Sequence, residues 1–232
     1  MDLKVKDVAE LLNVSEKTIR RWLATGKIPA YRLNHQYRFS RIEIENWMMG
    51  FKQEAAKEGF LLKDEPSATL SKGGLQQFSL YRAIHNGGVF PHAEGETKEE
   101  VIRTTMKVVA PKLGLDAEVL SELLLDRENL MPTAVGHGIG IPHARDFLLQ
   151  GPSDTVVVVF PKKPLEYGAL DGEPVHALFF LFSSNDKRHL HLLAKIAHLS
   201  RNPQASQLLR SQPSEKKLLD FIRQWEPVGG KC

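Results

Sequence analysis

A stretch with little apolar content divides this chain of 232 residues. Between about Glu58 and Gln77 the sequence has no sustained apolar period and contains Asp-Glu-Pro-Ser-Ala-Thr and Ser-Lys-Gly-Gly. Pro, Gly and Ser in such a run favour turns and irregular backbone over a packed element. We therefore predict four parts, which are a small N-terminal unit, a linker, a larger unit and a tail: residues 1–57, 58–74, 75–226 and 227–232.

The larger unit mixes two kinds of apolar pattern. Helical periods occur at about 97–110, 116–127, 187–200 and 214–225, and strand-like apolar runs at 155–160 and 175–183. Helices that alternate with fully apolar strands are typical of layered α/β domains. With 42% hydrophobic residues, the chain can bury such a core. The predicted fold class is α/β, an α+β mixed sheet with flanking helices, preceded by the small unit.

The positive charge of the chain is concentrated in the small unit. The net charge is +3, and residues 1–58 hold 11 Lys and Arg against 8 Asp and Glu, which accounts for the whole excess. Within 15–41 there are seven basic residues and one acid, Glu16. Such a local excess, which includes Arg41, predicts contact with a polyanion.

The small unit reads as two short helices, a hairpin and a third helix. An amphipathic helix is predicted over Leu3–Leu12 and a second from Ser15 to Ala24, with Ser15 as its N-cap. Alternating residues on both sides of 34–36 predict a hairpin, and a third helix follows from Arg41. Apolar residues of the first two helices can share a core, with Trp22 in it. The basic residues of the second helix then point outward, as in a helix-turn-helix.

The same residues carry a family resemblance. Val-Lys-Asp-Val-Ala-Glu-Leu-Leu-Asn-Val-Ser-Glu-Lys-Thr-Ile-Arg-Arg-Trp-Leu, followed by Gly-Lys-Ile-Pro-Ala-Tyr-Arg-Leu, resembles the excisionase group of MerR-like winged helices over about residues 1–50. The resemblance implies binding of double-stranded DNA, with the second helix in the major groove and the hairpin as a wing. The candidate contacts are Ser15, Lys17, Thr18, Arg20 and Arg21 on the helix and Asn34, His35 and Arg38 on the wing. The alternative is a module reused for protein contacts, with these cations on a solvated face. Because single small modules bind DNA weakly, we expect a homodimer on a two-fold site.

A run rich in glycine and histidine stands out in the larger unit. In Gly-His-Gly-Ile-Gly-Ile-Pro-His-Ala-Arg (136–145), three glycines let the backbone approach a ligand and Pro142 fixes the turn that presents His143. Imidazole is nucleophilic when neutral and forms a labile N-phosphoryl bond, so phosphoryl relay between proteins favours histidine. Backbone N–H groups of such a loop can stabilise added negative charge. The predicted phosphate loop comprises Gly136, His137, Gly138 and Gly140. From these residues alone, an ordinary tight turn explains the run equally well.

Four ordered motifs resemble a known domain family. Leu-Leu-Asp-Arg-Glu-Asn-Leu (124–130), the glycine run ending in Pro-His-Ala-Arg, Gly-Glu-Pro-Val (172–175) and Arg-His-Leu-His-Leu-Leu-Ala-Lys-Ile-Ala (188–197) are similar to the phosphotransferase-system enzyme IIA domain of the fructose, mannitol and nitrogen-regulatory type. The resemblance covers about Leu75 to Trp225. It implies that His143 is phosphorylated, that His189 is a second active-site histidine, and that Arg127 is a cation beside the phosphoryl oxygens. It also implies a histidine phosphocarrier protein as partner.

The chain departs from the family at His137 and Gly140, where enzyme IIA domains commonly have Gly-Asn-Gly-Ile-Ala. Three histidines, 137, 143 and 189, would be a candidate zinc set, but their spacing lacks a paired or helical ligand pattern. We therefore expect no metal and no other cofactor. The remaining histidines are expected to be structural or exposed.

The leading hypothesis is a cytoplasmic regulator that accepts a phosphoryl group on His143 and acts through its DNA-binding module, as a phosphoryl-transfer component rather than a stand-alone enzyme. The single Cys232 indicates a reducing compartment, no apolar run is long enough for a membrane span, and the N-terminus is no signal peptide. Two alternatives remain. One is a DNA-binding regulator whose second domain binds a regulatory protein partner and is never phosphorylated. The other is a sugar-system enzyme IIA that passes its phosphoryl group to an enzyme IIB.

Overall fold

The computed structural model describes residues 2–12, 14–33, 36–50, 78–144, 149 and 153–229. The predicted linker at 58–74 and the predicted unit boundaries at 57 and 75 lie outside the described residues. So do Asn34 and His35 of the predicted wing.

The N-terminal module has the helix-turn-helix order that the sequence predicts. Its elements are β1 (Asp2–Leu3), α1 (Val5–Leu12), α2 (Glu16–Ala24), β2 (Tyr31–Leu33), β3 (Gln36–Ser40) and α3 (Arg41–Gly50). Helix α2 begins after Ser15, whose side chain accepts a hydrogen bond from the Thr18 N–H, so the predicted N-cap is present. The strands form an antiparallel sheet in the order β1-β3-β2. The first helix starts at Val5 rather than at the predicted Leu3, because β1 pairs Leu3 with Phe39.

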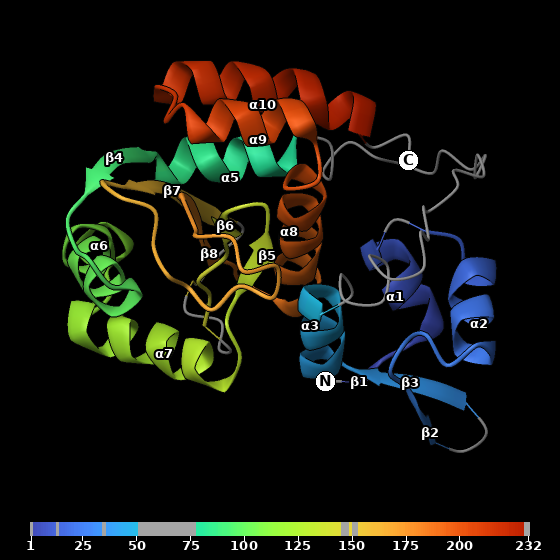
Figure 1. Ribbon diagram of the computed structural model, residues 1–232. Coiled ribbons are helices and arrows are strands. Elements are labelled where there is room, and N and C mark those ends of the chain that lie inside the picture. The colour runs from blue at the N-terminus through green and yellow to red at the C-terminus, as the bar shows by residue number, and fades with distance from the viewer. Residues whose placement is uncertain are drawn as a thin grey trace.

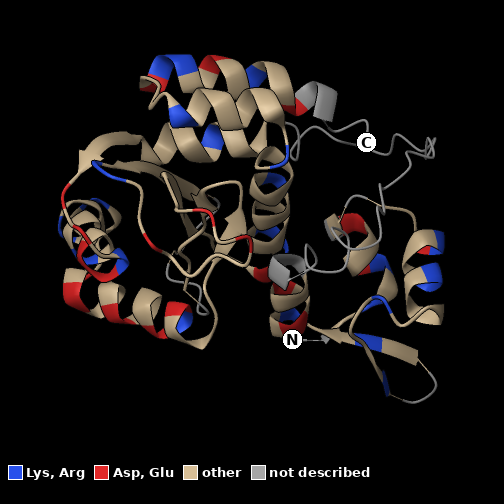
Figure 2. Cartoon of the chain, viewed as in Figure 1, with Lys and Arg blue, Asp and Glu red and all other residues tan. Residues whose placement is uncertain are grey.

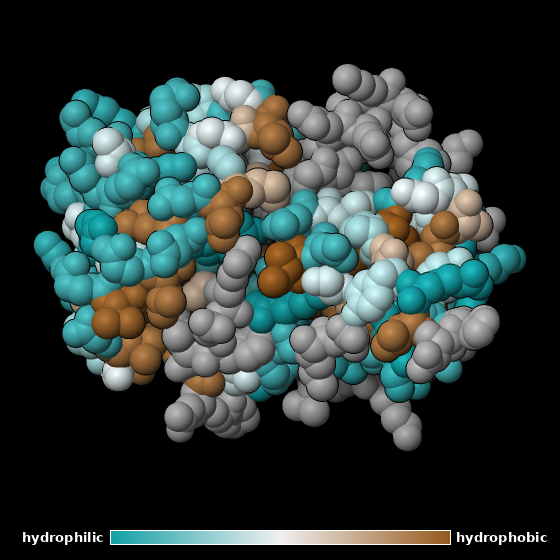
Figure 3. Space-filling model, turned by 90° about the horizontal axis from the view of Figure 1, so that it is seen from below, coloured by the Kyte–Doolittle hydropathy of each residue, from teal (hydrophilic) through white to brown (hydrophobic). Residues whose placement is uncertain are grey.

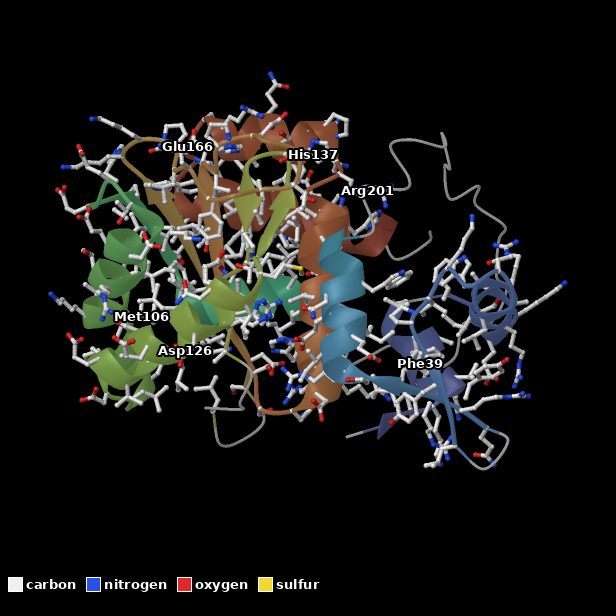
Figure 4. All side chains as sticks on the ribbon, turned by 60° about the horizontal axis from the view of Figure 1, so that its bottom comes forward. Phe39, Met106, Asp126, His137, Glu166 and Arg201 are labelled. Carbon is white, nitrogen blue, oxygen red and sulfur yellow. The ribbon has the colours of Figure 1, made fainter. Side chains whose placement is uncertain are left out.

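A small apolar core holds this module together. Ile19 and Trp22 of α2 pack with Phe39 of β3 and Ile44 of α3. Phe39 points into the module in Figure 4. The same cluster includes Leu190, which belongs to a helix of the larger unit. The core of the N-terminal module is therefore completed by the other half of the chain.

The larger unit contains a mixed sheet and six helices among the described residues. Its elements are α5 (Ser79–Gly87), β4 (Val89–Ala93), α6 (Lys98–Leu113), α7 (Ala117–Leu130), β5 (Ala134–Gly136), β6 (Ile139–Gly140), β7 (Thr155–Pro161), β8 (Ala177–Phe182), α8 (Asp186–Leu199), α9 (Pro203–Arg210) and α10 (Glu215–Gly229). The strand order is β4-β7-β8-β6-β5. The pairs β4–β7 and β6–β8 are parallel, and β7–β8 and β5–β6 are antiparallel. The predicted mixed sheet with flanking helices is confirmed.

Side chains that alternate along β7 and β8 fill a core on each face of the sheet. Val156 and Phe179 face one core, which also contains residues of α5, α8, α9 and α10. Val157 and Phe180 face the other, which α6 and α7 complete. Because both faces are covered, both strands are continuous apolar runs instead of alternating ones. Figure 1 shows α5, α9 and α10 on one side of the sheet and α6 and α7 on the other.

Helix α8 stands between the sheet and the N-terminal module. It contacts β8 and α5 of its own unit and also α1 and α3 of the module. In Figure 1 it separates the two halves, and α3 runs beside it. Helix α10 continues to Gly229, so residues 227–229 of the predicted tail belong to this helix. This last turn could not be predicted, because no apolar period extends beyond Trp225.

The described residues include no helix that is long and apolar enough to cross a membrane. Large apolar side chains at the surface, such as Val119 and Leu130 of α7 and Ile42 of α3, are spread over several elements. In the space-filling view of Figure 3, apolar side chains reach the surface in several separate groups among hydrophilic ones. Scattered exposed apolar residues are usual for folded proteins and do not by themselves identify an interface.

Candidate functional site

His143 lies in an extension of strand β6. It forms an isolated parallel bridge with Leu181 of β8, and the Leu181 N–H donates to the Pro142 carbonyl over 3.0 Å. The side chain is fully buried. His143 is thus held by the sheet, and its backbone position is fixed on the central strand.

A hydrogen bond assigns the tautomer of His143. Its Nδ1 lies 2.7 Å from the carbonyl oxygen of Ile141. A carbonyl oxygen only accepts, so Nδ1 carries the proton and donates it. In the neutral ring the lone pair is therefore on Nε2, which is the nucleophilic atom of this side chain.

His189 meets His143 from the first turn of α8. Asn185 caps this helix, and Ser183 Oγ lies 3.1 Å from His189 Nδ1. The two imidazole rings are 5.1 Å apart between centroids in an edge-to-face arrangement. Burial lowers the pKa of His189 to about 4, partly offset by Glu45, so this side chain is neutral at pH 7. The structure brings both predicted histidines together.

A carboxylate that sequence reasoning missed completes the cluster. Glu45 of α3 places its Oε2 3.8 Å from His143 Nε2 and its Oε1 3.2 Å from His189 Nε2. Burial alone would raise the pKa of Glu45, but His143 and His189 outweigh it and hold the pKa well below its usual range. Its charge is balanced by Arg41, whose Nε donates to Glu45 Oε1 over 2.7 Å.

Arg41 corrects one prediction. As part of the basic stretch 15–41 it is predicted to contact a polyanion, yet it is 9% exposed and contacts Glu45 and, over 3.1 Å, Asp186 of α8. A guanidinium held by two carboxylates at this depth is turned away from any polyanion. The spacing of Arg41 and Glu45, four residues apart, was a signal for an ion pair but not for its burial.

Arg127 lies near the end of α7 and reaches the same module. Its Nη1 donates to the Met131 carbonyl over 3.0 Å, and its Nη2 donates to Asn46 Oδ1 over 3.4 Å. Asn46 follows Glu45 on α3. The predicted cation is therefore buried beside the helix that covers the histidines.

The glycines of the predicted phosphate loop form a hairpin turn between β5 and β6. His137 has φ 54° and is exposed, with its N–H donating to Asp171 Oδ2 over 2.8 Å. Figure 4 shows it at the outer end of the hairpin. A Cβ at Gly138 would lie 2.1 Å from His176 Nδ1, and one at Gly140 would lie 2.8 Å from Leu178. Turn geometry and close packing thus account for these glycines, and contact of the loop with phosphate stays a prediction.

Glu45, His143 and His189 are also the residues that could hold a metal ion. One ligand atom from each lies within 4.8 Å of the others. These three residues are not the zinc set weighed from the sequence, which was His137, His143 and His189. His137 lies before β6, at the opposite end of this strand from His143. Arg41 already supplies positive charge to the Glu45 carboxylate, and a divalent cation would place more positive charge beside this guanidinium.

The predicted DNA-binding side chains of α2 lie on one exposed face. Lys17, Arg20 and Arg21 are exposed, and Arg20 makes a surface ion pair with Glu16 over 3.7 Å. Ser15 and Thr18 are at the start of this helix, where their hydroxyl oxygens are 2.9 Å apart. Arg38 of β3 is partly buried and bonds Gln36. In Figure 2 the blue colour of Lys and Arg marks several positions on the ribbon of α2 and of strands β2 and β3.

The larger unit is thus an α/β domain with a mixed sheet covered by helices on both faces, and it holds two buried histidines, one just after β6 and one at the start of α8. Residues 83–225 match the family described as "Phosphoenolpyruvate-dependent sugar phosphotransferase system, EIIA 2". The chain belongs to this family. Residues 3–51 match a family described as "Helix-turn-helix domain".

Individual proteins agree with this assignment. The chain is 34% identical over 146 residues to a "Nitrogen regulatory protein" of Pseudomonas aeruginosa, which covers 62% of this chain and 94% of the relative. The structure of "Nitrogen Regulatory Protein IIA-Ntr from Neisseria meningitidis" has the same fold, with a TM-score of 0.52 and 23% identity over 62% of this chain and 94% of that one. The N-terminal region is 48% identical over 44 residues to "Transcriptional repressor DcmR" of Methylorubrum extorquens, which is 18% of this chain and 17% of that protein.

Proposed function

We propose that His143 Nε2 accepts a phosphoryl group from a histidine phosphocarrier protein, and that the chain is a regulator of the nitrogen-regulatory kind. The hydrogen bond from Nδ1 to the Ile141 carbonyl carries this proposal, because it fixes the lone pair on Nε2. A nucleophile whose tautomer is preset needs no proton transfer before it attacks. The nitrogen regulatory relatives support the regulatory branch over sugar uptake.

The environment of His143 suits an anionic group next to Nε2. The Glu45 carboxylate lies close to Nε2 of both imidazoles, so an anion already has a place there. Arg127 of the same domain reaches this region, where its Nη2 donates to Asn46, and its guanidinium offers forked N–H donors that match phosphoryl oxygens. We assign His189 and Arg127 to the stabilisation of the phosphoryl group, as donors around its oxygens.

The transfer step balances without an added base. The Nε2 lone pair of His143 attacks the phosphorus of the donor's phosphohistidine, the new N–P bond forms, and the donor's N–P bond breaks. The donor imidazole leaves with the electron pair of that bond. The Nδ1 proton of His143 stays in place and remains bonded to the Ile141 carbonyl.

Incubation of the full chain with phosphoenolpyruvate, enzyme I and a histidine phosphocarrier tests this proposal. We expect one acid-labile phosphate per chain, located by mass spectrometry on the peptide that contains His143. Omission of the phosphocarrier should leave the chain unlabelled. A label on another residue, or no label after the carrier itself has been phosphorylated, would contradict the proposal.

We further propose that the N-terminal module binds double-stranded DNA through α2. Its exposed cations Lys17, Arg20 and Arg21 lie on a helix that is on the far side of the module from α8 (Figure 1). A helix with arginines and small hydroxyl side chains fits the major groove, where arginine reads guanine. One such module buries little surface, so a homodimer on a two-fold site is part of the proposal.

Replacing Arg20 and Arg21 together with alanine should weaken DNA binding strongly. Loss of one arginine that reads a base in the groove weakens the binding free energy by about 1–3 kcal/mol. Loss of one phosphate contact lowers the slope of log K against log salt concentration by about one. We expect at least about tenfold weaker binding of the target sequence in fluorescence anisotropy titrations at several salt concentrations. The double variant Lys216→Ala and Lys217→Ala, which removes two exposed cations from α10, is the matched control. Equal affinity of the Arg20/Arg21 variant and wild type would refute groove reading by α2.

A further inference from the structure

Helix α3 covers the nucleophilic atom of His143. Glu45, His143 and His189 are all buried, and Glu45 comes from the N-terminal module while the histidines come from the other half of the chain. A phosphocarrier must bring its phosphohistidine in line with Nε2, to about 3 Å. Nε2 is buried, and Glu45 Oε2 lies 3.8 Å from it, within the distance that an incoming phosphorus would need.

Two linked ion pairs hold this carboxylate in position. Arg41 donates to Glu45 within α3, and its Nη1 lies 3.1 Å from Asp186 Oδ1 at the start of α8. The Arg41 and Asp186 side chains are 10% and 20% exposed, so water screens this ion pair only in part. The arrangement ties the base of α3 to the helix that carries His189.

One face of α8 provides most of the contact with the module. Asp186, His189 and Leu190 lie on this face, and Leu190 packs into the apolar core of the module. Lys187 Nζ extends the contact to Glu10 of α1, over 2.7 Å. The face combines a buried apolar contact with complementary charges, which is the composition of a specific interface.

From this geometry we propose that docking of the N-terminal module and phosphorylation of His143 are mutually exclusive. The Glu45 carboxylate is an internal occupant of the phosphoryl position, and the module must leave before a phosphocarrier can reach Nε2. Once formed, the phosphohistidine keeps the module undocked. This inference rests on the proposed phosphorylation of His143 and adds the regulation of that site.

Electrostatic repulsion and steric overlap both destabilise a state in which the module is docked and His143 is phosphorylated. A phosphoryl group adds about −1.5 to −2 charge at neutral pH. On Nε2 its oxygens would occupy the volume of a carboxylate that is buried, and like charges at this distance in a poorly screened site repel strongly. The coupling is reciprocal, so whatever stabilises docking must make phosphorylation less favourable at equilibrium by the same free energy.

Undocking leaves the proposed DNA-reading face itself unchanged. Lys17, Arg20 and Arg21 are exposed while the module is docked. Phosphorylation would therefore free the enzyme IIA-type half from a DNA-bound module, instead of uncovering the recognition helix. The freed surfaces are the face of α8 around Leu190 and the opposing sides of α1 and α3.

The rate of phosphorylation of a Glu45→Gln chain tests the proposal. Only undocked molecules meet the carrier, so the rate follows the undocked fraction, and we expect an increase of about tenfold over wild type. Glu43→Gln is the matched control, because it removes the same charge from an exposed position of α3 and should leave the rate unchanged. Initial rates are measured with phosphoenolpyruvate, enzyme I and a limiting concentration of phosphocarrier.

Energy transfer between two dyes gives a second readout that does not depend on Glu45. Dyes are placed on cysteines introduced at Ala24 and Val119, which are exposed at the end of α2 and on α7, in a chain with Cys232→Ser. Phosphorylation should lower the transfer efficiency in otherwise wild-type protein. In Glu45→Gln the efficiency should be low before phosphorylation as well.

The outcomes separate this inference from the proposed function. If no variant is labelled, both the phosphoryl-acceptor function and the inference fail. If wild type and Glu45→Gln are labelled at equal rates, or if phosphorylation leaves the transfer efficiency unchanged or raises it, the inference alone is overturned. Faster labelling of Glu45→Gln with a drop in transfer on phosphorylation supports it.

Discussion

A chain in which His143 is replaced by alanine is expected to acquire no acid-labile phosphate, under conditions that label the wild type fully. In His143 the lone pair lies on Nε2, because Nδ1 carries the proton and donates it to the Ile141 carbonyl. Phosphate incorporation is measured over time with radiolabelled phosphoenolpyruvate, and acid lability identifies the N–P bond. His85→Ala, at an exposed position of α5, is the control and should label normally.

His189→Ala should slow the same reaction without abolishing it. His189 lies beside His143 and offers Nε2 toward the position that the Glu45 carboxylate occupies. Removing one preorganised donor around a developing charge typically costs about 100-fold in rate. Label that persists in His143→Ala, or a His189→Ala chain that reacts at the wild-type rate, would show that the acceptor or its helper has been misassigned.

The long elements of the fold could be predicted from the sequence because each has a strong local pattern. The runs at 155–160 and 175–183 became β7 and β8, and the helical periods became α6, α7, α8 and α10. Strands β5 and β6 have only three and two residues, too few to show a period. Their hairpin was visible only as a glycine run, which fits a turn and a ligand loop equally well.

The two histidines of the candidate site could be predicted from the sequence, but the Glu45 carboxylate that contacts them could not. His143 and His189 were identified through motifs that belong to one domain, and the structure brings them together. Glu45 is 98 residues before His143 in the other unit, and no local pattern encodes a contact between units. In the sequence, Arg41 and Glu45 have the spacing of an ordinary surface ion pair on a helix. Their burial follows only from the docking of α3 on α8.

The same contact changes how coupling between the two halves is understood. Across a linker alone, the charge of a phosphoryl group on His143 has no evident path to the N-terminal module. The structure places a residue of that module against Nε2, so the path is a direct contact. Phosphorylation of His143 and release of the module then take place at the same interface, and no coupling through the intervening residues is required.

Glu226→Gln is expected to destabilise the enzyme IIA-type half by about 3 kcal/mol, because its buried carboxylate joins three elements. It accepts hydrogen bonds from the Leu80 and Tyr81 N–H groups over 3.0 and 2.9 Å, at the start of a helix whose N-cap, Phe78, has no side-chain cap. It also accepts from Lys195 Nζ of α8 over 2.6 Å. Burial lowers the pKa of Lys195, and Glu226 offsets this, so loss of the carboxylate leaves a half-buried ammonium without its counter-charge.

Urea unfolding of the full chain, followed by tryptophan fluorescence, measures this loss. Glu215→Gln is the control, since it removes the same charge from an exposed position of α10 and should cost less than about 0.5 kcal/mol. Adding Lys195→Met to Glu226→Gln should recover part of the stability, because the second change removes the cation that has lost the Glu226 charge and keeps an apolar side chain of similar length. If the double variant is no more stable than Glu226→Gln, the cost arises from the uncapped start of α5 and not from the cation. If Glu226→Gln unfolds at the same urea concentration as wild type, the carboxylate does not hold α5, α8 and α10 together.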